Sequence, residues 1–276
     1  MKKENNILTH IILIIASFIS IFPVIWIFST SFKYKSDVLK PSISIIPENP
    51  TLSNYTYVLT MDNYIFWKWL INSVFIAIIT TIIGLFLAST TAYAFSRFEF
   101  WGKKTLLFSF LLTQMFPGAI LIVPLYNIVK NMSLLDTYIG LIIAYSTISL
   151  PFCVWMLKSF FDTIPKSLDE AAMVDGLNAF STFWKIILPL SLPGLAVTAF
   201  FSFITAWNEF MFALTFMSSS NHYTLPVGLR TFVFEFNTDW HYMAAGAVIV
   251  TLPVLFFFLI AQKFLISGLT TGGVKG

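Results

Sequence analysis

Six long apolar stretches constrain this sequence more than any other feature. They cover roughly residues 10–32, 69–95, 105–129, 138–160, 186–214 and 242–265. A helix that crosses a bilayer needs about 20 mostly apolar residues. The stretches are continuous rather than alternating at every second residue, which excludes both a β-barrel and the core of a soluble domain. The sequence therefore predicts an all-α membrane protein with six transmembrane helices.

The amino-acid composition agrees with a protein that lies in the membrane. Hydrophobic residues make up 57% of the chain and charged residues 11%, whereas a soluble domain carries about 25% charged residues. The first apolar stretch is longer than the roughly 7–15 residues of a signal-peptide core, and no A-x-A cleavage site follows, so we interpret it as an uncleaved span. The net charge of +3 does not favour nucleic acid as a partner. Cys153 lies in an apolar stretch and is expected to be buried and inert.

The distribution of Lys and Arg predicts the orientation, because cytoplasmic loops are enriched in these residues. With both termini in the cytoplasm, the inner side carries Lys2, Lys3, Arg97, Lys103, Lys104, Lys158, Lys166, Lys185, Lys263 and Lys275. The other six lie outside: Lys33, Lys35, Lys40, Lys68, Lys130 and Arg230. We expect one membrane domain over residues 1–276. It comprises a first span and extracytoplasmic loop (1–68), a core bundle (69–265) and a cytoplasmic tail (266–276).

A row of small residues marks one face of the second predicted span. Thr80, Gly84, Ala88 and Ala92 recur at every fourth position and therefore share one side of a helix. Such a face lets another helix approach closely. Close packing within this chain and contact with a partner subunit are both consistent with the pattern.

A short polar segment, SLDEAAMVDG (167–176), interrupts the apolar stretches on the predicted cytoplasmic side. Ser167 and Glu170 have the S-x-x-E spacing of a capping box, and Asp169 and Glu170 complement the positive end of a helix dipole. Gly176 lies where a left-handed residue would end the helix. The segment thus predicts a helix of about two turns over residues 168–175.

The exposed side of this helix is expected to be small and apolar, with Leu168, Ala171 and Ala172 clustered at helical spacing. A second amphipathic stretch follows, and its apolar residues Phe180, Phe183, Trp184 and Ile187 are expected on one side, in the headgroup region. From pattern alone, the whole loop could also be an interfacial connector without a special role.

The loop also contains a longer pattern, E-A-A-x3-G-x9-I-x-L-P. Its residues are Glu170, Ala171, Ala172, Gly176, Ile186, Leu188 and Pro189. This pattern resembles the signature loop of the permease subunits of binding-protein-dependent ABC importers. The phrases LLDTYIGLIIAY (134–145), AWNEFMFALTF (206–216) and GLTTGGVKG (268–276) are similar to the carbohydrate branch of that family, akin to the smaller maltose-type permease.

The resemblance implies a half-pore that pairs with a second, homologous permease in the cytoplasmic membrane. A dimer of ATPase subunits would hydrolyse ATP with Mg, and an extracytoplasmic binding protein would deliver a sugar. Residues Ser167 to Gly176 would form the coupling helix that docks on the ATPase: Glu170 would contact it, Ala171 and Ala172 would allow close seating, and Gly176 would make the turn. The tail either reaches toward the ATPase or frays.

The chain itself is predicted not to be an enzyme and to bind no cofactor. It lacks a G-x4-G-K-[ST] phosphate loop, and its three histidines, His10, His222 and His241, are scattered. Ionisable groups inside spans are candidates for a transport path. Asn208 and Glu209 are the clearest pair, either lining the pore or anchoring helix packing, while Gln114, Tyr126 and Asn127 are weaker candidates.

Two alternatives stay open at this point. The same kind of permease could import a non-sugar solute such as a glycerol phosphoester. A secondary transporter without an ATPase would usually show inverted repeats and intramembrane acids, and both are nearly absent here. The sequence does not name the sugar.

Overall fold

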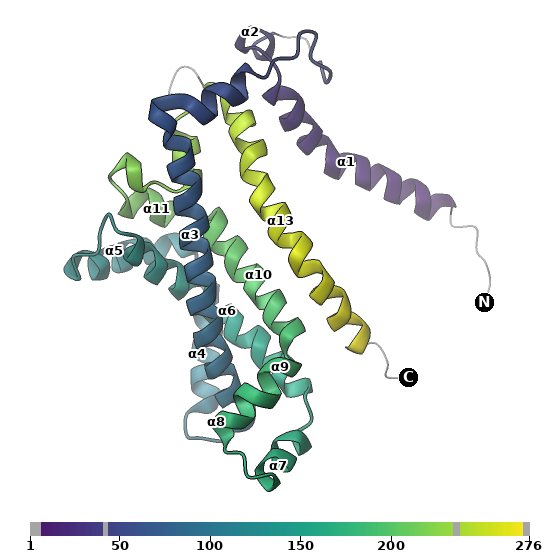
Figure 1. Cartoon of the computed structure of the whole chain (residues 1–276), viewed down its shortest axis with the longest axis vertical. Coiled ribbons are helices and arrows are strands. Elements are labelled where there is room, and N and C mark those ends of the chain that lie inside the picture. Colours follow the sequence, from purple (N-terminus) through teal and green to yellow (C-terminus); the bar gives the residue numbers. More distant parts are fainter. Residues whose placement is uncertain (1–6, 41–43, 234–237, 273–276) are drawn as a thin grey trace. The chain divides into compact units, whose positions relative to one another are not determined.

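The structure of the chain is a computed structural model that describes residues 7–40, 44–233 and 238–272. Every regular element in this described part is helical (Figure 1). The elements are α1 (Ile7–Ser31), α2 (Lys35–Val38), α3 (Ser53–Arg97), α4 (Lys103–Met115), η1 (Gly118–Leu121), α5 (Ile122–Asn131), α6 (Tyr138–Thr163), α7 (Ser167–Val174), α8 (Ala179–Thr182), η2 (Phe183–Ile187), α9 (Leu188–Leu190), α10 (Leu192–Asn208), α11 (Met211–Phe216), η3 (Ser220–His222), α12 (Leu225–Arg230) and α13 (Trp240–Gly272). The all-α prediction is thereby confirmed.

Four of these helices are long and apolar enough to cross a membrane: α1, α3, α6 and α13. Within α3, the backbone leaves the helical conformation from Met61 to Tyr64. Two further predicted spans are sharply bent. The stretch predicted as 105–129 divides into α4 and η1–α5, which meet at 106°, and the stretch predicted as 186–214 bends by 80° between α9 and α10. The described residues therefore contain four spans, or up to six if each bent pair is one span.

Proline chemistry accounts for the first of these bends. Phe116 adopts an extended conformation (φ −82°, ψ 132°) after the last residue of α4. The following Pro117 disfavours a helical conformation at the residue before it and cannot donate a backbone hydrogen bond. Pro23, Pro151 and Pro253 lie inside α1, α6 and α13, where a bundle can satisfy the freed carbonyl groups.

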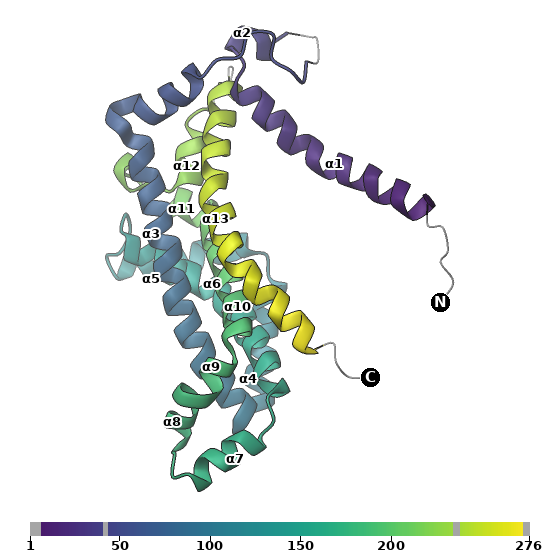
Figure 2. The same ribbon diagram turned by 45° about the vertical axis from the view of Figure 1, so that its right-hand side comes forward.

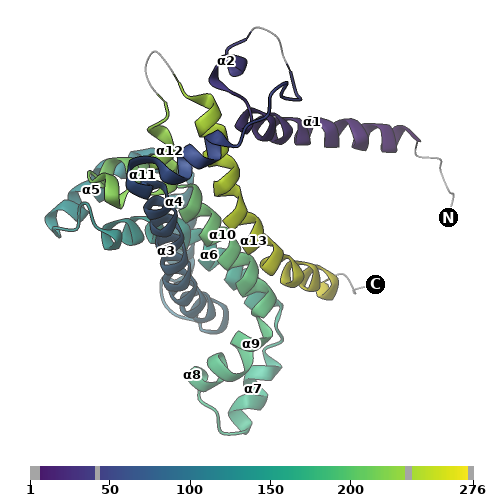
Figure 3. The same ribbon diagram turned by 45° about the horizontal axis from the view of Figure 1, so that its top comes forward.

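The chain forms two compact units, one made of residues 1–67 and 228–253 and the other of residues 68–227 and 254–276. The second unit contains most of α3 together with α4, α6 and α10, which run side by side (Figures 1 and 2). Its α5 contacts α11 at one side of these helices (Figure 3). The expectation of a single membrane domain stays a prediction.

The apolar core of the second unit lies at the end from which α7 and α8 extend (Figure 2). Residues from α3, α6, the α6–α7 turn and η2 build it: Ala88, Ala92, Tyr93, Phe95, Cys153, Val154, Leu157, Phe161, Ile164, Phe183 and Ile187. Cys153 is fully buried there, as the sequence predicts. The loop that carries the signature pattern is thus joined to this apolar core.

The row of small residues on α3 packs inside this chain. Thr80, Ala88 and Ala92 are completely buried. A Cβ atom added at Gly84 would lie 3.4 Å from the Ser202 hydroxyl of α10 and 3.8 Å from that of Ser149 on α6. Of the two alternatives for this face, close packing within the chain is the one that the structure contains.

The first unit is held by polar contacts near the ends of its helices. The side-chain amide of Asn54 donates to the backbone carbonyls of Ser31 (2.9 Å) and Lys33 (2.8 Å), which fixes the end of α1 to the start of α3. Lys35 pairs with Asp239 at 2.7 Å. None of the apolar window of α1 is buried. This helix therefore presents its whole apolar surface to lipid or to a partner.

Candidate functional site

The short helix α7 begins differently from the sequence prediction. Lys166, not Ser167, precedes the helix, and its backbone is already helical (φ −64°, ψ −22°) with no side-chain cap. The Leu168 amide donates to the carbonyl of Pro165, and the Asp169 and Glu170 amides donate to that of Lys166. The prediction of a capping box formed by Ser167 and Glu170 is therefore wrong. The turn before the helix already supplies backbone carbonyls as acceptors for the first amides of α7.

The end of α7 agrees with the prediction. Gly176 adopts φ +83°, in the left-handed region that glycine enters without steric cost. The Gly176 amide donates to the carbonyl of Met173 (3.0 Å), and the Leu177 amide donates to that of Ala172 (2.9 Å). This pair of bonds is a Schellman motif, which satisfies carbonyl groups at the helix end.

The inner face of α7 carries a buried carboxylate that is paired with an arginine of α3. Asp169 Oδ2 lies 2.9 Å from Arg97 Nε, and both side chains are buried. These two atoms are close enough to form an ion pair, but their geometry is not that of a hydrogen bond. The Tyr93 hydroxyl donates to Asp169 Oδ1 at 3.2 Å. One carboxylate therefore ties the short helix to two residues of α3.

Arg97 also holds the end of α6. Its guanidinium donates to the backbone carbonyls of Phe161 (3.1 Å) and Ile164 (3.0 Å), the last groups before the α6–α7 turn. A cation at this place satisfies otherwise free carbonyls and complements the negative end of the helix dipole. Next to it, the Ser96 hydroxyl donates to Asp162 (2.7 Å), which also pairs with Lys158 (2.6 Å). Arg97 thus joins α3, α6 and α7 at a single point.

Arg97, Tyr93 and Asp169 are anchors of α7 that the sequence patterns do not predict. The patterns assign Asp169 only an effect on the helix dipole, and Arg97 only a charge in a cytoplasmic turn. The available signal was an arginine at the end of an apolar stretch, since a cation there requires a partner if it is buried. Its partner is 72 residues away along the chain (169 minus 97), so local spacing could not identify it.

The outer face of α7 is apolar and exposed. Glu170, Ala171 and Met173 are exposed, and Val174 is 87% exposed. Ala172 is only 2% exposed and lies on the inner face with Asp169, which is 7% exposed. The expectation that Ala172 belongs to the exposed face is wrong, because residues three apart on a helix share one side, and that side packs on this chain.

The stretch after Gly176 is likewise divided between two environments. Asn178 caps α8 by accepting a hydrogen bond from the Ser181 amide at 2.8 Å. Phe183 and Ile187 are buried in the core of the unit, whereas Phe180 and Trp184 are exposed. The expectation of one shared apolar side is wrong, since η2 is a π-helix and its wider turn changes which residues align.

The later residues of the signature pattern support the bend into α10. Ile186 and Leu188 pack against the core cluster, and Pro189 is exposed. Gly194 is buried at the start of α10, where an added Cβ would lie 2.6 Å from the ring of Phe160. The glycine thus lets α10 approach α6 more closely than any side chain would allow.

The polar pair Asn208–Glu209 stands at the break between α10 and α11. The Glu209 carboxylate accepts hydrogen bonds from the amides of Phe212 (2.8 Å) and Ala213 (3.1 Å). These amides belong to the first turn of α11 and have no partner within the helix. Glu209 therefore anchors the start of α11, while Asn208 is exposed. Of the weaker candidates, Gln114 donates to the Ile148 carbonyl at 3.3 Å.

Within the described residues, no three His, Cys, Asp or Glu side chains gather in a way that could hold a metal ion. The predicted tail is helical as far as Gly272. Residues 273–276 lie outside the described residues.

Asp136 holds the turn between α5 and α6 to the loop after α11. It accepts hydrogen bonds from the amides of Ser218 (3.0 Å) and Ser219 (3.1 Å), and His222 Nδ1 lies 3.2 Å from its second oxygen. Burial alone would raise the pKa of Asp136, but the hydrogen bonds from the Ser219 and Ser218 amides, together with the nearby His222 ring, lower it below its ordinary value.

This lowered pKa predicts a stabilising contribution that is present above pH 3.8 and is lost as the pH falls through the folded-state pKa of Asp136. Asp136→Asn is expected to lower the melting temperature at pH 7 and to remove this part of the acid sensitivity. Thermal unfolding in detergent at pH 7 and pH 3 measures both effects. Asp175→Asn, at an exposed aspartate, is the matched control. Equal melting curves for Asp136→Asn and wild type would contradict the prediction.

The comparisons with known proteins point to one family. The family model described as "Binding-protein-dependent transport system inner membrane component" matches residues 81–271. The chain is 40% identical over 259 residues to the trehalose transport system permease protein SugB of Mycobacterium tuberculosis, covering 93% of each protein. It is 38% identical over 279 residues to the trehalose/maltose transport system permease protein MalG of Thermococcus litoralis, covering 100% of both.

A solved structure shares the fold. It is a chain of a bacterial ABC transporter involved in the import of the acidic polysaccharide alginate. The TM-score is 0.81 at 24% sequence identity, covering 96% of this chain and 99% of that chain.

Proposed function

Because this chain belongs to the family of binding-protein-dependent transport system inner membrane components, we propose that it translocates a sugar or oligosaccharide through the cytoplasmic membrane. It is a membrane subunit rather than an enzyme. The names of the relatives, which include permeases for trehalose and for trehalose/maltose, favour a carbohydrate. No observation favours a glycerol phosphoester.

The proposed topology has six spans, with each bent helix pair counted as one span and both termini in the cytoplasm. The Lys and Arg bias supports this orientation, and it places α7 in the cytoplasm. The proposed partners are a second homologous permease, an extracytoplasmic solute-binding protein, and a dimer of ATPase subunits that hydrolyses ATP with Mg.

We place the contact with the ATPase on the exposed face of α7. The observation that carries this assignment is Val174, a large apolar side chain left 87% exposed on a helix that is otherwise firmly anchored. Ala171 and Met173 extend the same apolar surface, and Glu170 adds a charge beside it. A small apolar patch with exposed acidic neighbours, Glu170 and Asp175, suits a groove on another protein. Ala172, which is buried, acts by seating α7 on its own chain.

Coupling in this proposal is mechanical. ATP closes the ATPase dimer, and the docked α7 moves with it. Asp169 transmits the displacement to Arg97, which also holds the end of α6. The helices α3, α6 and α7 therefore move together, because an ion pair and several hydrogen bonds meet at one arginine. We assign Asn208, the exposed member of the polar pair, to the solute path. The Glu209 carboxylate is already hydrogen-bonded to the first turn of α11.

The experiment that tests this proposal is Val174→Asp. We expect loss of ATPase subunits from the purified complex and loss of ATP-dependent sugar uptake, because a carboxylate cannot enter an apolar groove without a large desolvation penalty. Leu39→Asp is the matched control, since Leu39 is also exposed and apolar but lies near α2, on the proposed outer side. A Val174→Asp complex with normal ATPase content and normal uptake would contradict the docking assignment.

A further inference from the structure

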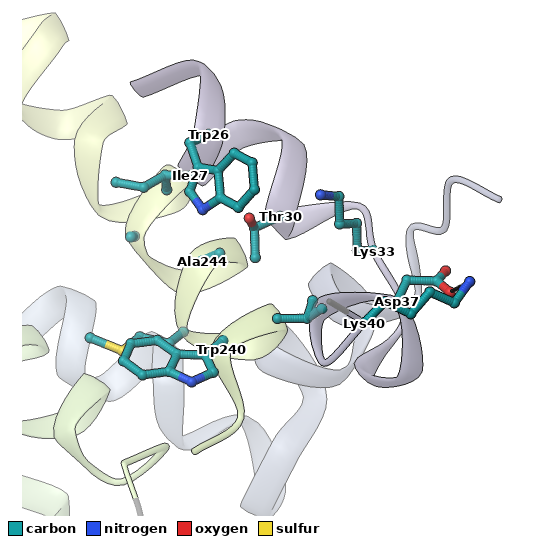
Figure 4. Close-up of a pocket in the computed structure, with 11 residues that line it drawn as sticks. Trp26, Ile27, Thr30, Lys33, Asp37, Lys40, Trp240 and Ala244 are labelled. Atoms are coloured by element: carbon teal, nitrogen blue, oxygen red, sulfur yellow. Dashed lines mark ion pairs between the residues drawn. The ribbon is translucent and has the colours of Figure 1, made fainter. Parts of the chain in front are cut away.

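A cavity of about 480 Å³ lies in the first unit, between the end of α1, α2 and the start of α13 (Figure 4). The sides formed by α1 and α13 are largely apolar, with the rings of Trp26 and Trp240 and the small side chains of Ala244 and Ala247. Its rim is charged and carries Lys33, Asp37 and Lys40. Nothing in the proposed transport cycle uses this cavity.

Lys33 is the unusual residue of the rim. It is only 5% exposed, and its ammonium donates to the Ser44 carbonyl and lies 4.7 Å above the ring of Trp26. Both of these partners are neutral. Among the described residues, no carboxylate lies within ion-pair distance of Lys33. A buried cation of this kind is costly unless an anion compensates it.

The neighbouring lysines are already compensated. Lys40 pairs with Asp37 at 2.7 Å and with Glu48 at 3.7 Å, and Lys35 pairs with Asp239 at 2.7 Å. Lys33 is therefore the lysine of the rim that makes no ion pair within the described residues, and it lies at the mouth of an apolar chamber. Lys33 and this chamber together match a ligand with a negatively charged head and an apolar body.

We propose that this cavity binds a glycerophospholipid, with the phosphate at Lys33 and the upper part of an acyl chain inside. A phosphodiester carries a single negative charge at neutral pH and would therefore supply the anionic partner of the Lys33 ammonium. Ala247 lies seven residues after Trp240, so the cavity extends about 10 Å along α13 at roughly 1.5 Å per residue. The lipid belongs to the outer leaflet in the proposed topology.

The position of the cavity favours lipid over the other occupants. Trp26 lies within the last two turns of α1 and Trp240 is the first residue of α13, and tryptophan near the ends of apolar helices marks the membrane–water interface. The apolar window of α1 is fully unburied, so acyl chains can reach the cavity along this helix. A saccharide would need several hydrogen-bonding groups inside the chamber, and the α1 and α13 sides there offer mainly carbon.

The test is native mass spectrometry of the whole importer complex in detergent, titrated with 1-palmitoyl-2-oleoyl phosphatidylglycerol. The diacylglycerol with the same chains serves as the probe without phosphate. We expect Lys33→Met to weaken retention of phosphatidylglycerol by about tenfold, since a charge-assisted bond to the phosphate is lost. Ala247→Trp, which fills the chamber, is expected to weaken retention of both lipids.

Two matched controls separate the cavity from general effects. Lys33→Arg keeps the positive charge and should retain the phospholipid. Ala16→Trp makes the same change as Ala247→Trp at an exposed position of α1 and should leave retention unchanged. Equal retention of phosphatidylglycerol by wild type, Lys33→Met and Ala247→Trp would overturn the proposal. So would equal retention of phosphatidylglycerol and diacylglycerol by wild type, or loss of saccharide binding in Ala247→Trp with lipid retention unchanged. None of these readouts depends on transport.

Discussion

Arg97→Ala is expected to abolish ATP-dependent uptake and to reduce sharply the amount of folded protein. The substitution leaves the Asp169 carboxylate buried without its cation and removes the donors to the carbonyls of Phe161 and Ile164. Breaking a buried ion pair by removing one partner costs about 3–5 kcal/mol. The loss is measured as folded protein recovered in detergent and as uptake by cells or proteoliposomes.

A matched control and a double variant separate folding from coupling. Arg230→Ala replaces the chain's other arginine, which is exposed, and should have little effect. Arg97→Met combined with Asp169→Leu leaves no unpaired charge, and such apolar replacements of a buried pair are often tolerated. We expect this variant to recover folded protein and ATPase subunits but to transport fewer sugar molecules per ATP hydrolysed. Full uptake with the wild-type number of sugar molecules transported per ATP hydrolysed would show that the Arg97–Asp169 pair has no part in coupling.

Gly140→Ala is the second substitution with a large expected effect. A Cβ at Gly140 would overlap the backbone carbonyl of Leu134 and would lie 3.0 Å from a methyl group of Val129. The Leu134 carbonyl is itself fixed, because it accepts a hydrogen bond from Thr137 at 2.7 Å. A backbone group cannot rotate away as a side chain can, so we expect destabilisation of about 3 kcal/mol and a melting temperature lower by roughly 5–10 °C.

Gly118→Ala makes the same substitution where it should do no harm. No atom lies within 4 Å of a Cβ added at Gly118, and the exchange reduces the entropy of the unfolded chain. We expect a neutral or slightly higher melting temperature for this control. Similar melting temperatures for Gly140→Ala and Gly118→Ala would contradict the close approach of the α5–α6 turn to the start of α6.

The two ends of α7 show how far local sequence could predict this site. Gly176 was identified correctly because a left-handed helix end depends on one residue's own steric freedom. The capping box failed because it required a non-helical backbone at Ser167, and the Pro165–Lys166 turn removed that condition. A spacing of residue types predicts a cap only when the preceding backbone leaves the amides free.

The predicted spans show a similar limit. Hydropathy located all six apolar stretches, but it could not distinguish a helix that continues through a proline from one that bends there. Pro151 lies inside the unbroken α6, whereas Pro117 coincides with a bend of 106°. The residue before Pro117 is extended, whereas α6 continues through Pro151, and apolar composition alone does not decide between these two outcomes.

The sequence by itself determined that the chain is helical, lies in a membrane and carries the signature loop of an importer permease, because composition, apolar length and motif spacing are local properties. Only the tertiary structure decided which side of α7 is free. Ala171 and Ala172 are adjacent and identical in chemistry, yet one is exposed and the other is buried with Asp169 against this chain. The buried ion pair to Arg97, 72 residues away (169 minus 97), fixes that orientation, and no local pattern encodes a contact over such a distance.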